Sequence, residues 1–326
     1  MSILISVIIP SAGRRPDLLK KSIQSALINE QGIKTEIIVV LNGKDGMTFD
    51  LSNSFQHPLL TYHKIEEGNV CKARNFGLSV AQGQLIRFLD DDDYLHKDVA
   101  KKQYHDFLLN IDLDLSLFSL DIEDTKGNLI KRVNPSVGSY SFFEYALNPK
   151  IALPFAFVYR KKLIENVDWD IECRIPEDED WLRRVATQGK INFMCSDQSV
   201  GVWYQHDGER LSQTLASQDF CYNKYVSIMN LYFSNPVEKY HSKMAEALWE
   251  CVHDGFYFSP FFWSKIALKA RSIDSKSKPK DLLFQKTPDF IHPLFIEWFM
   301  LPKRWLLHKF RLLKFFLGIS SFIRKI

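Results

Sequence analysis

The sequence predicts an α/β protein whose doubly wound, mainly parallel sheet is flanked by helices and followed by an α-helical extension. Strand-like apolar runs alternate with amphipathic helical stretches over the first ~95 residues, which is the rhythm of such a sheet. Helical periodicity and dense aromatic residues replace this alternation from residue 217 onward. We therefore expect a sheet-containing domain at 1–215 and a helical extension at 216–326.

The first strand is expected at Ile3–Pro10, because a nearly continuous run of β-branched apolar residues suits a strand buried on both faces. Pro16 and Asp17 then open an amphipathic helix. The same reasoning predicts strands at 36–41, 59–65 and 85–89, with a helix at 68–81 before the last of them. Ligands bind at the carboxyl ends of strands in such sheets, so the polar turns 11–15, 42–45 and 90–93 should line one cleft.

The pattern beyond Tyr94 mixes helices with extended segments. Helices are expected at 96–109, at 141–147 and after Pro176, and extended segments at 113–122, 129–133, 155–159, 191–194 and 199–204. In the extension, helices are expected at 222–233 and 237–252, and the polar stretch 272–280 reads as a linker.

Four consecutive aspartates, Asp90–Asp93, directly follow the strand expected at 85–89. Adjacent carboxylates repel one another, so the electrostatic free energy of placing them side by side is lowest in water or around a bound cation. Mg²⁺ and Mn²⁺ prefer carboxylate and phosphate oxygens as ligands. The run therefore indicates either a hard-cation site or a solvated acidic turn whose last aspartate caps the next helix.

Composition and charge exclude several classes of protein. A hydrophobic content of 46% excludes wholesale disorder, and a net charge of +3 is too small to argue for nucleic acid. The five cysteines are scattered without CxxC spacing, so we expect reduced thiols in a cytoplasmic protein. The N-terminus reads as a strand and not as a signal peptide, and no apolar run approaches the about 18 residues of a spanning helix.

Five segments share the order and spacing of a known family. They are SVIIPSAGRRPDLLKKSIQSAL at 6–27, EIIVVLNG at 36–43, CKARNFGLSVAQGQLIRFLDDDDYL at 71–95, PEDEDWLRR at 176–184 and YQHDGERLS at 204–212. Together they resemble the inverting nucleotide-sugar glycosyltransferases of family 2, over residues 3 to about 215. The resemblance implies a GT-A fold and a metal-dependent, inverting transfer of a hexosyl or N-acetylhexosaminyl group. The implied donor is a nucleoside diphosphate sugar, with a UDP-sugar expected, and the implied acceptor is a hydroxyl of a glycan or lipid-linked glycan in surface polysaccharide synthesis.

The resemblance also implies the residues that bind the donor. Pro10, Ser11 and Ala12 are expected to contact the nucleoside, and Arg74 the diphosphate, where a guanidinium suits phosphate geometry. Asn42 stands where the family often has an aspartate that pairs with the base, and an amide can still donate and accept there. The alternative for Arg74 is an exposed helix residue.

Asp90 and Asp92 match the DxD motif of the family, with Asp91 at its variable position. The resemblance implies that Asp92 binds Mn²⁺ or Mg²⁺ together with Asp90 and His206, and that Asp90 and Asp91 also contact the nucleotide sugar. The alternative for His206 is an exposed loop residue.

An inverting transfer needs one base to remove the proton of the acceptor hydroxyl. Asp178 matches the base of the family, Glu177 lies beside it, and Asp180 is a further candidate. The alternative is that these acids only complement the dipole at the start of a helix. The segment 168–170 has a DxD form but does not follow a strand, so we expect a loop, which is a candidate part of the acceptor site.

The segment 290–326 interleaves aromatic with basic residues, and from Trp298 to the end it contains seven Lys or Arg and no acidic residue. This pattern is typical of an amphipathic helix at an anionic membrane interface, which predicts peripheral attachment at the inner face of the cell membrane. The alternative is that the aromatics pack on the body or on a second subunit. Nucleic acid is not expected as a partner, because no binding module is recognised.

Two other functions remain open from the sequence. A nucleotidyltransferase can use a similar sheet and carboxylates, but its first loop is usually rich in glycine, and 11–15 contains one glycine. A catalytically inactive glycosyltransferase-like protein that binds a nucleotide sugar or scaffolds an assembly is the second, and Asn42 favours it.

Overall fold

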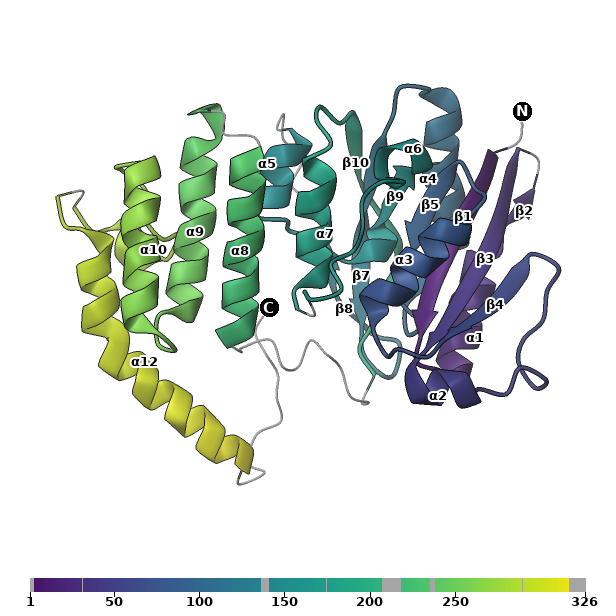
Figure 1. The fold of residues 1–326 in the computed structure, drawn as a ribbon, viewed down its shortest axis with the longest axis horizontal. Helices are drawn as coiled ribbons and strands as arrows, with labels where there is room; N and C mark the ends of the chain where they lie inside the picture. Colours follow the sequence, from purple (N-terminus) through teal and green to yellow (C-terminus); the bar gives the residue numbers. More distant parts are fainter. Residues whose placement is uncertain are drawn as a thin grey trace. The chain divides into compact units, whose positions relative to one another are not determined.

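The computed structural model describes residues 3–30, 32–135, 141–173, 175–206, 218–234, 238–288 and 290–316, with side chains in the last helix described up to residue 307. The chain forms two compact units, Met1–Leu215 and Ala216–Ile326 (Figure 1). All five cysteines are free thiols, as their scattered positions predict.

The first unit is built around a mixed sheet. Ten strands of the described chain pair in the order β2-β3-β1-β5-β9-β7-β10-β6, with β4 on β3 and β8 on β7. The parallel half contains β1 (Ile3–Ser11), β3 (Ile33–Asn42), β4 (Leu60–Ile65) and β5 (Leu85–Phe88). The short strand β2 (Asn29–Glu30) pairs antiparallel with β3 at that edge. The other half contains β7 (Leu115–Glu123), β9 (Phe157–Arg160) and β10 (Phe193–Tyr204), with the shorter strands β6 (Tyr94–Leu95) and β8 (Leu129–Val133). Because β9 is antiparallel to both β5 and β7, the sheet is mainly but not purely parallel.

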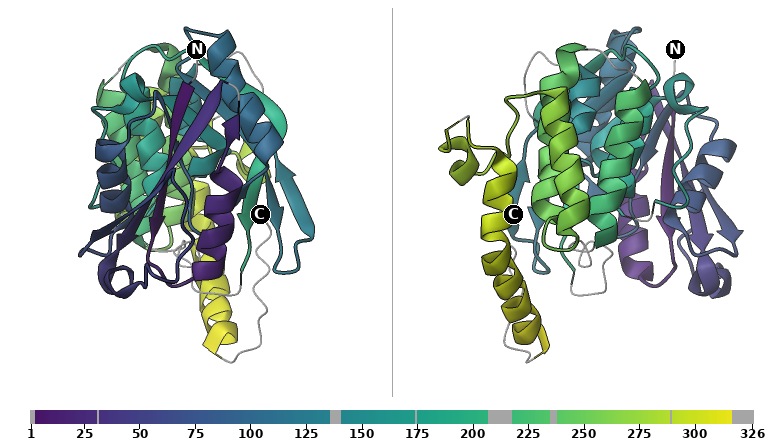
Figure 2. Two further views of the ribbon diagram at one scale, coloured as in Figure 1. Left: turned by 90° about the vertical axis from the view of Figure 1, so that its right-hand side faces the viewer. Right: turned by 60° about the vertical axis from the view of Figure 1, so that its left-hand side comes forward.

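β1 lies between β3 and β5, and its apolar side chains from Ile5 to Ile9 are fully buried because helices cover both faces of the sheet. α3 (Val70–Val80) covers one face, while α1 (Pro16–Ala26) and α4 (Lys97–Leu109) cover the other (Figure 2). Gly77 of α3 lies directly against Ile8, where a Cβ would meet Ile8 Cγ2 at 2.4 Å. This close approach packs the last turn of α3 tightly against the middle of β1.

The remaining helices of the unit are short: α2 (Gly43–Thr48), α5 (Phe142–Leu147), α6 (Lys161–Ile164) and α7 (Glu177–Ala186). Two expectations are wrong in detail. The turn expected at 42–45 opens α2, with Gly43 at a φ of +75° that favours glycine. The two strands expected at 191–194 and 199–204 form the single strand β10, whose register shifts between Ser196 and Ser199.

The second unit is helical, as predicted, and contains α8 (Gln218–Ser234), α9 (His241–Gly255), α10 (Pro260–Ile273), α11 (Leu282–Gln285) and α12 (Pro293–Phe316). Trp249 and Trp263 lie in its core. The segment expected as a linker at 272–280 is a packed loop instead, because buried Ser277 accepts a hydrogen bond from Trp249 Nε1 at 3.0 Å. None of the helices that the structure describes, α12 included, is long and apolar enough to span a membrane.

Candidate active site

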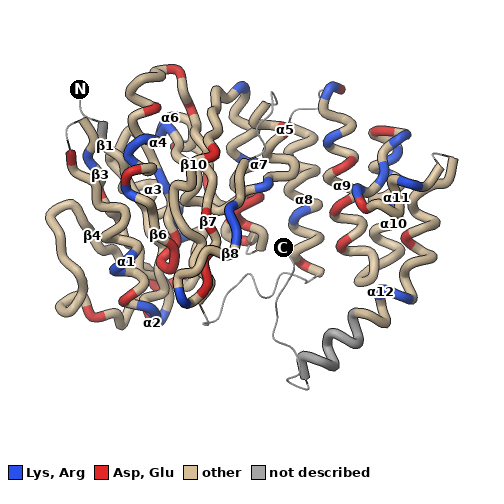
Figure 3. The backbone as a smooth tube through the Cα atoms, turned by 180° about the vertical axis from the view of Figure 1, so that it is seen from behind, with Lys and Arg blue, Asp and Glu red and all other residues tan. Residues whose placement is uncertain are grey.

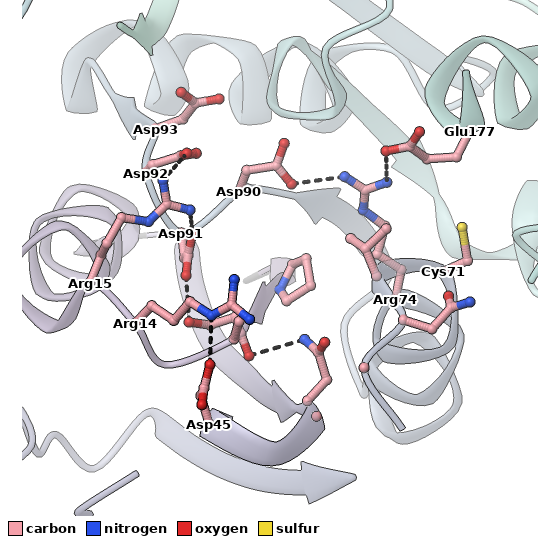
Figure 4. Close-up of a pocket in the computed structure, with 18 of the residues that line it drawn as sticks. Arg14, Arg15, Asp45, Cys71, Arg74, Asp90, Asp91, Asp92, Asp93 and Glu177 are labelled. Atoms are coloured by element: carbon pink, nitrogen blue, oxygen red, sulfur yellow. Dashed lines mark hydrogen bonds and ion pairs between the residues drawn. The ribbon is translucent and has the colours of Figure 1, made fainter. Parts of the chain in front are cut away.

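A cleft with a cavity volume of about 710 Å³ lies at the carboxyl ends of β1, β3 and β5. The turns after these three strands line it together, and α3 and α7 add one wall each (Figure 4). The lining includes ten of the site residues expected from the sequence: Pro10, Ser11, Ala12, Asn42, Arg74, Asp90, Asp91, Asp92, Glu177 and Asp178. His206 and the further candidate Asp180, which is buried and bonds Arg184, are not among the lining residues. Figure 3 shows the acidic segment that precedes β6 at this edge of the sheet.

Arg74 joins the two acidic groups of the cleft. Its Nη2 donates to Asp90 Oδ1 at 2.8 Å and its Nη1 to Asp178 Oδ1 at 3.0 Å, with Glu177 Oε1 3.9 Å from Nη1. The residue is only 1% exposed, so the alternative of an exposed helix residue is wrong. The forked guanidinium is suited to this task, because it presents donors to two carboxylates at once.

Trp169, in the loop expected at 168–170, packs against Arg74, and this contact was not predicted from the sequence. The Arg74 guanidinium carbon lies 4.2 Å from the Trp169 ring centroid, and Trp169 stacks on Trp181 of α7 with 4.5 Å between centroids. Asn75 bonds both the backbone N–H and the carbonyl of Trp169, at 2.8 and 2.9 Å. The expected loop at 168–170 therefore contributes a buried platform, and no local pattern in the sequence assigns this tryptophan to Arg74.

Burial raises the pKa of Asp178 well above its ordinary value, and the neighbouring carboxylates Glu177 and Asp90 raise it further, while Arg74 opposes the shift. Burial also raises the pKa of Glu177. The Asp178 side chain remains 23% exposed in the cleft, so a ligand can reach it. A carboxylate with a raised pKa is a better proton acceptor near neutral pH than an ordinary aspartate.

The aspartate run is not a solvated turn, because Asp91 and Asp93 are both buried. Ser11 Oγ donates to Asp91 Oδ2 at 2.5 Å, and burial raises the pKa of Asp91 to about 6. Asp93 Oδ1 accepts a hydrogen bond from the backbone N–H of Tyr204 at 3.1 Å, so it connects β10 to the aspartate run. The acidic-turn alternative expected Asp93 to cap the next helix, α4, and it does not do so.

Arg15 was also missed in the sequence and faces the same run. Its Nη1 donates to Asp92 Oδ2 at 2.9 Å and its Nη2 lies 3.2 Å from Asp91 Oδ1 (Figure 4). His206 Nε2 is 2.9 Å from Asp92 Oδ2, and Arg15 Nη1 contacts His206 as well. The alternative of an exposed His206 is therefore wrong. In the sequence, the adjacent Arg14 and Arg15 before Pro16 could have indicated a contact between this turn and the aspartate run.

The residues around Asp92 fit a small divalent cation that a substrate would help to bind. Within the described part of the chain, no three His, Cys, Asp or Glu side chains converge on one point. The 2.9 Å between Asp92 Oδ2 and His206 Nε2 nevertheless matches two adjacent ligands of a cation with bonds of about 2.1 Å. The guanidinium of Arg15 already lies against both atoms, so the position attracts positive charge. Mg²⁺ typically takes one or two carboxylates and completes its shell with phosphate oxygens and water.

Two further lining residues have defined states. Asn42 Nδ2 donates to the Ser11 carbonyl at 3.0 Å, which uses one amide proton to join the ends of β3 and β1. Cys71 lies in α3, and burial raises its pKa to about 12. Its thiol is therefore protonated at neutral pH and does not act as a nucleophile.

Comparison with known proteins agrees with this geometry. Residues 6–168, half of the chain, match the model of the family described as Glycosyl transferase family 2. The chain is 23% identical over 167 residues to the minor teichoic acid biosynthesis protein GgaB of Bacillus subtilis, covering 50% of this chain and 18% of that protein. It is 21% identical over 245 residues to the poly(ribitol-phosphate) beta-glucosyltransferase of Bacillus spizizenii, covering 72% of this chain and 38% of that protein. The chain thus spans well under half the length of both relatives.

Among solved structures, S. aureus TarS 1–349 in complex with UDP-GlcNAc is similar, with a TM-score of 0.52 and 16% identity over 84% of this chain and 88% of that one. At this identity the likeness concerns the fold alone, and it confirms the expected GT-A architecture. Three of the five segments found in the sequence, at 6–27, 36–43 and 71–95, lie within the residues that the family model matches. The chain belongs to glycosyl transferase family 2.

Proposed function

We propose that this chain transfers a sugar from a UDP-sugar to a hydroxyl of a glycan or lipid-linked glycan, with inversion at the anomeric carbon. Membership of the family supports glycosyl transfer. Two relatives carry the names of a teichoic acid biosynthesis protein and a poly(ribitol-phosphate) glucosyltransferase, which supports a role in surface polysaccharide synthesis. The complex of TarS with UDP-GlcNAc supports a uridine nucleotide as donor.

The observation that carries the proposal is the arrangement of Asp90, Arg74 and Asp178 across one cleft. Asp90 begins the aspartate run that would face the donor, and Asp178 begins the helix that would face the acceptor. Arg74 holds both at hydrogen-bond distance, so a donor and an acceptor would meet between them. The raised pKa of Asp178 suits the proton transfer that an inverting reaction requires.

In the proposed reaction, Asp178 accepts the proton of the acceptor hydroxyl while that oxygen attacks the anomeric carbon. The bond between the anomeric carbon and the diphosphate oxygen breaks on the opposite face, and its electron pair leaves with the nucleoside diphosphate. Glu177 lies beside the base, and its negative charge raises the pKa of Asp178. Pro10, Ser11, Ala12 and Asn42 would bind the nucleoside, with Arg74 and the first two aspartates against the diphosphate and sugar.

We also propose that the reaction depends on Mn²⁺ or Mg²⁺, because the charges of the cleft do not balance. Its lining contains eight carboxylates against four basic side chains, namely Asp45, Glu66, Asp90, Asp91, Asp92, Asp93, Glu177 and Asp178 against Arg14, Arg15, Lys44 and Arg74. A nucleoside diphosphate adds further negative charge. Asp92, with Asp90 and His206, would hold the cation. When bound, it neutralises the charge that develops on the leaving diphosphate.

Calorimetric titration of UDP, GDP, CDP and dTDP, each with Mn²⁺ and again with EDTA, tests the proposal. We expect UDP to bind in Mn²⁺ and to lose most of its affinity in EDTA. Asp92→Asn should remove the metal dependence, whereas Asp168→Asn, an exposed aspartate outside the lining, serves as the matched control. Equal binding in Mn²⁺ and EDTA would exclude the metal. Binding of none of the four nucleotides would favour the inactive scaffold.

A further inference from the structure

We propose that the second unit docks on an anionic membrane surface through one aromatic face of α10 and α12. We define this aromatic face by five residues: Phe261 and Leu268 of α10, and Phe295, Trp298 and Phe299 of α12. The inference goes beyond the proposed sugar transfer and does not depend on it.

The only acidic residue of α12 points inward. Glu297 is 0% exposed and lies 2.8 Å from His253 Nδ1 of α9, and it accepts a hydrogen bond from Arg304 Nη1 at 2.7 Å. Arg304 Nη1 also donates to the His253 carbonyl at 3.0 Å. A network of charged and hydrogen-bonding groups therefore holds α12 against α9, on the side where a surface helix usually buries its apolar residues.

The aromatic residues of α12 point outward instead. Phe295 is 72% exposed and Phe299 is 84% exposed, and their spacing of four residues puts them on one side of the helix. The inward side of α12 carries Glu297 and Arg304 together with apolar residues that are half-buried, namely Leu294, Met300 and Leu301. Its outward side is nevertheless aromatic, whereas the outward face of a surface helix is usually polar. Leaving two phenylalanines in water is unfavourable, so an apolar environment is expected to cover them.

The aromatic face continues onto α10. Trp298 Nε1 donates to Ser264 Oγ at 3.1 Å, and the Trp298 ring lies 5.4 Å from that of Phe261. Phe261 is 79% exposed, and Leu268, two turns further along α10, is exposed as well. The exposed apolar surface thus extends over two packed helices and is not a single stray side chain.

The charges around this face favour anionic lipid over a second copy of the chain. α10 contains no acidic residue but has Lys265, Lys269 and Arg271, and Lys265 and Lys269 are exposed. α12 adds exposed Lys303, while its single acid, Glu297, is buried. Two copies that met through this face would bring like charges together. Phosphate headgroups would instead be attracted, and aromatic side chains suit the boundary between headgroups and acyl chains.

Sedimentation of the full chain with sucrose-loaded vesicles tests the inference. The vesicles contain either phosphatidylcholine with 30% phosphatidylglycerol or phosphatidylcholine alone. We expect the chain to bind the first kind and to bind the second much more weakly. Phe295→Ser combined with Phe299→Ser should weaken the binding at least tenfold. Lys265→Glu combined with Lys269→Glu should also weaken it, by about fivefold or more for each cation lost near the surface. Phe233→Ser in α8, also an exposed phenylalanine at 67%, is the matched control and should bind as the wild type does.

Each of three results would overturn the inference. They are failure of the wild type to bind anionic vesicles, equal binding by the wild type and the Phe295/Phe299 double variant, and a dimer in sedimentation velocity that this double variant dissociates. The last result would identify a second copy as the partner. UDP titration of the same variants should match the wild type, so failure of membrane binding is distinguishable from failure of the proposed sugar transfer.

Discussion

Asp178→Asn separates the chemistry of the cleft from its stability. Asparagine keeps the size of the side chain and can still accept the Arg74 Nη1 hydrogen bond of 3.0 Å, but it cannot accept a proton from the acceptor hydroxyl. A positioned general base contributes about 10²–10⁴ in rate, or about 3–5 kcal/mol. We therefore expect transfer to fall by at least about a hundredfold, with UDP affinity changed by less than about threefold, since uniform binding is retained.

The stability of this variant should move in the opposite direction. The hydrogen bond from Arg74 changes from a charged to a neutral acceptor, which costs about 1 kcal/mol. Removing a carboxylate that burial and two neighbouring acids disfavour gains about 1–3 kcal/mol, at the lower end because the side chain is 23% exposed and partly screened by water. The net gain of about 0–1 kcal/mol would raise the unfolding midpoint by at most about 4 °C.

The pH dependence gives this prediction a second readout. The pKa of Asp178 is higher in the folded than in the unfolded chain, so the folded state holds the proton more tightly and loses stability as pH rises through that pKa. Asparagine does not titrate. The unfolding midpoint of the variant minus that of the wild type should therefore be larger at pH 8 than at pH 5. Differential scanning fluorimetry measures both midpoints.

Two controls define what would refute this reasoning. Asp168→Asn, in the exposed position two residues before Asp170, should leave both transfer and unfolding unchanged. Asp180→Asn removes the charge that Arg184 Nε bonds at 2.6 Å on α7, so it should lower stability more than activity. Full transfer by Asp178→Asn would show that another group is the base, and a lower midpoint at pH 8 would show that Arg74 stabilises the ionised form more than burial disfavours it.

Three other variants test the remaining charged contacts. Arg74→Lys replaces a fork with a single ammonium that cannot bond Asp90 and Asp178 together, so thermal unfolding should show a loss of about 1.5–3 kcal/mol. Arg15→Gln removes the cation 2.9 Å from Asp92, and calorimetry without nucleotide should show Mn²⁺ affinity raised about tenfold, or about 1.4 kcal/mol; unchanged affinity would place the cation elsewhere. Glu297→Gln leaves the partly buried Arg304 without its counter-ion, so urea unfolding should report about 3 kcal/mol less stability in the helical unit.

Local patterns in the sequence were sufficient to predict most of the parallel half of the sheet. The β-branched run of β1 is buried on both faces, as its composition predicts, because helices pack on either side of it. The alternation of strands and helices up to β5 and the acidic segment after it follow the expected order. These features depend on periodicity within a few residues, which the sequence displays directly.

The contacts that build the cleft depend instead on pairs far apart in the chain. Arg74 and Asp178 are separated by 104 residues, and His206 and Asp92 by 114. β9 lies antiparallel between β5 and β7, and Trp169 and α7, which follow β9 in the chain, lie beside Arg74. No local pattern in the sequence indicates that strand pairing. For the same reason, the platform beneath Arg74 could be identified only once the fold was known.

The charges of the two surfaces explain why the overall composition was uninformative about partners. The net charge of +3 is a sum over a cleft with twice as many acidic as basic side chains and an aromatic face bordered by lysines. An anionic lipid surface would repel the first and attract the second, and screening over about 8 Å at physiological salt keeps the two effects local. The membrane of our proposal would therefore contact the helical face, and in the proposed reaction the cleft would need a cation before it could accept a diphosphate. Both requirements follow from where the charges lie and not from how many there are.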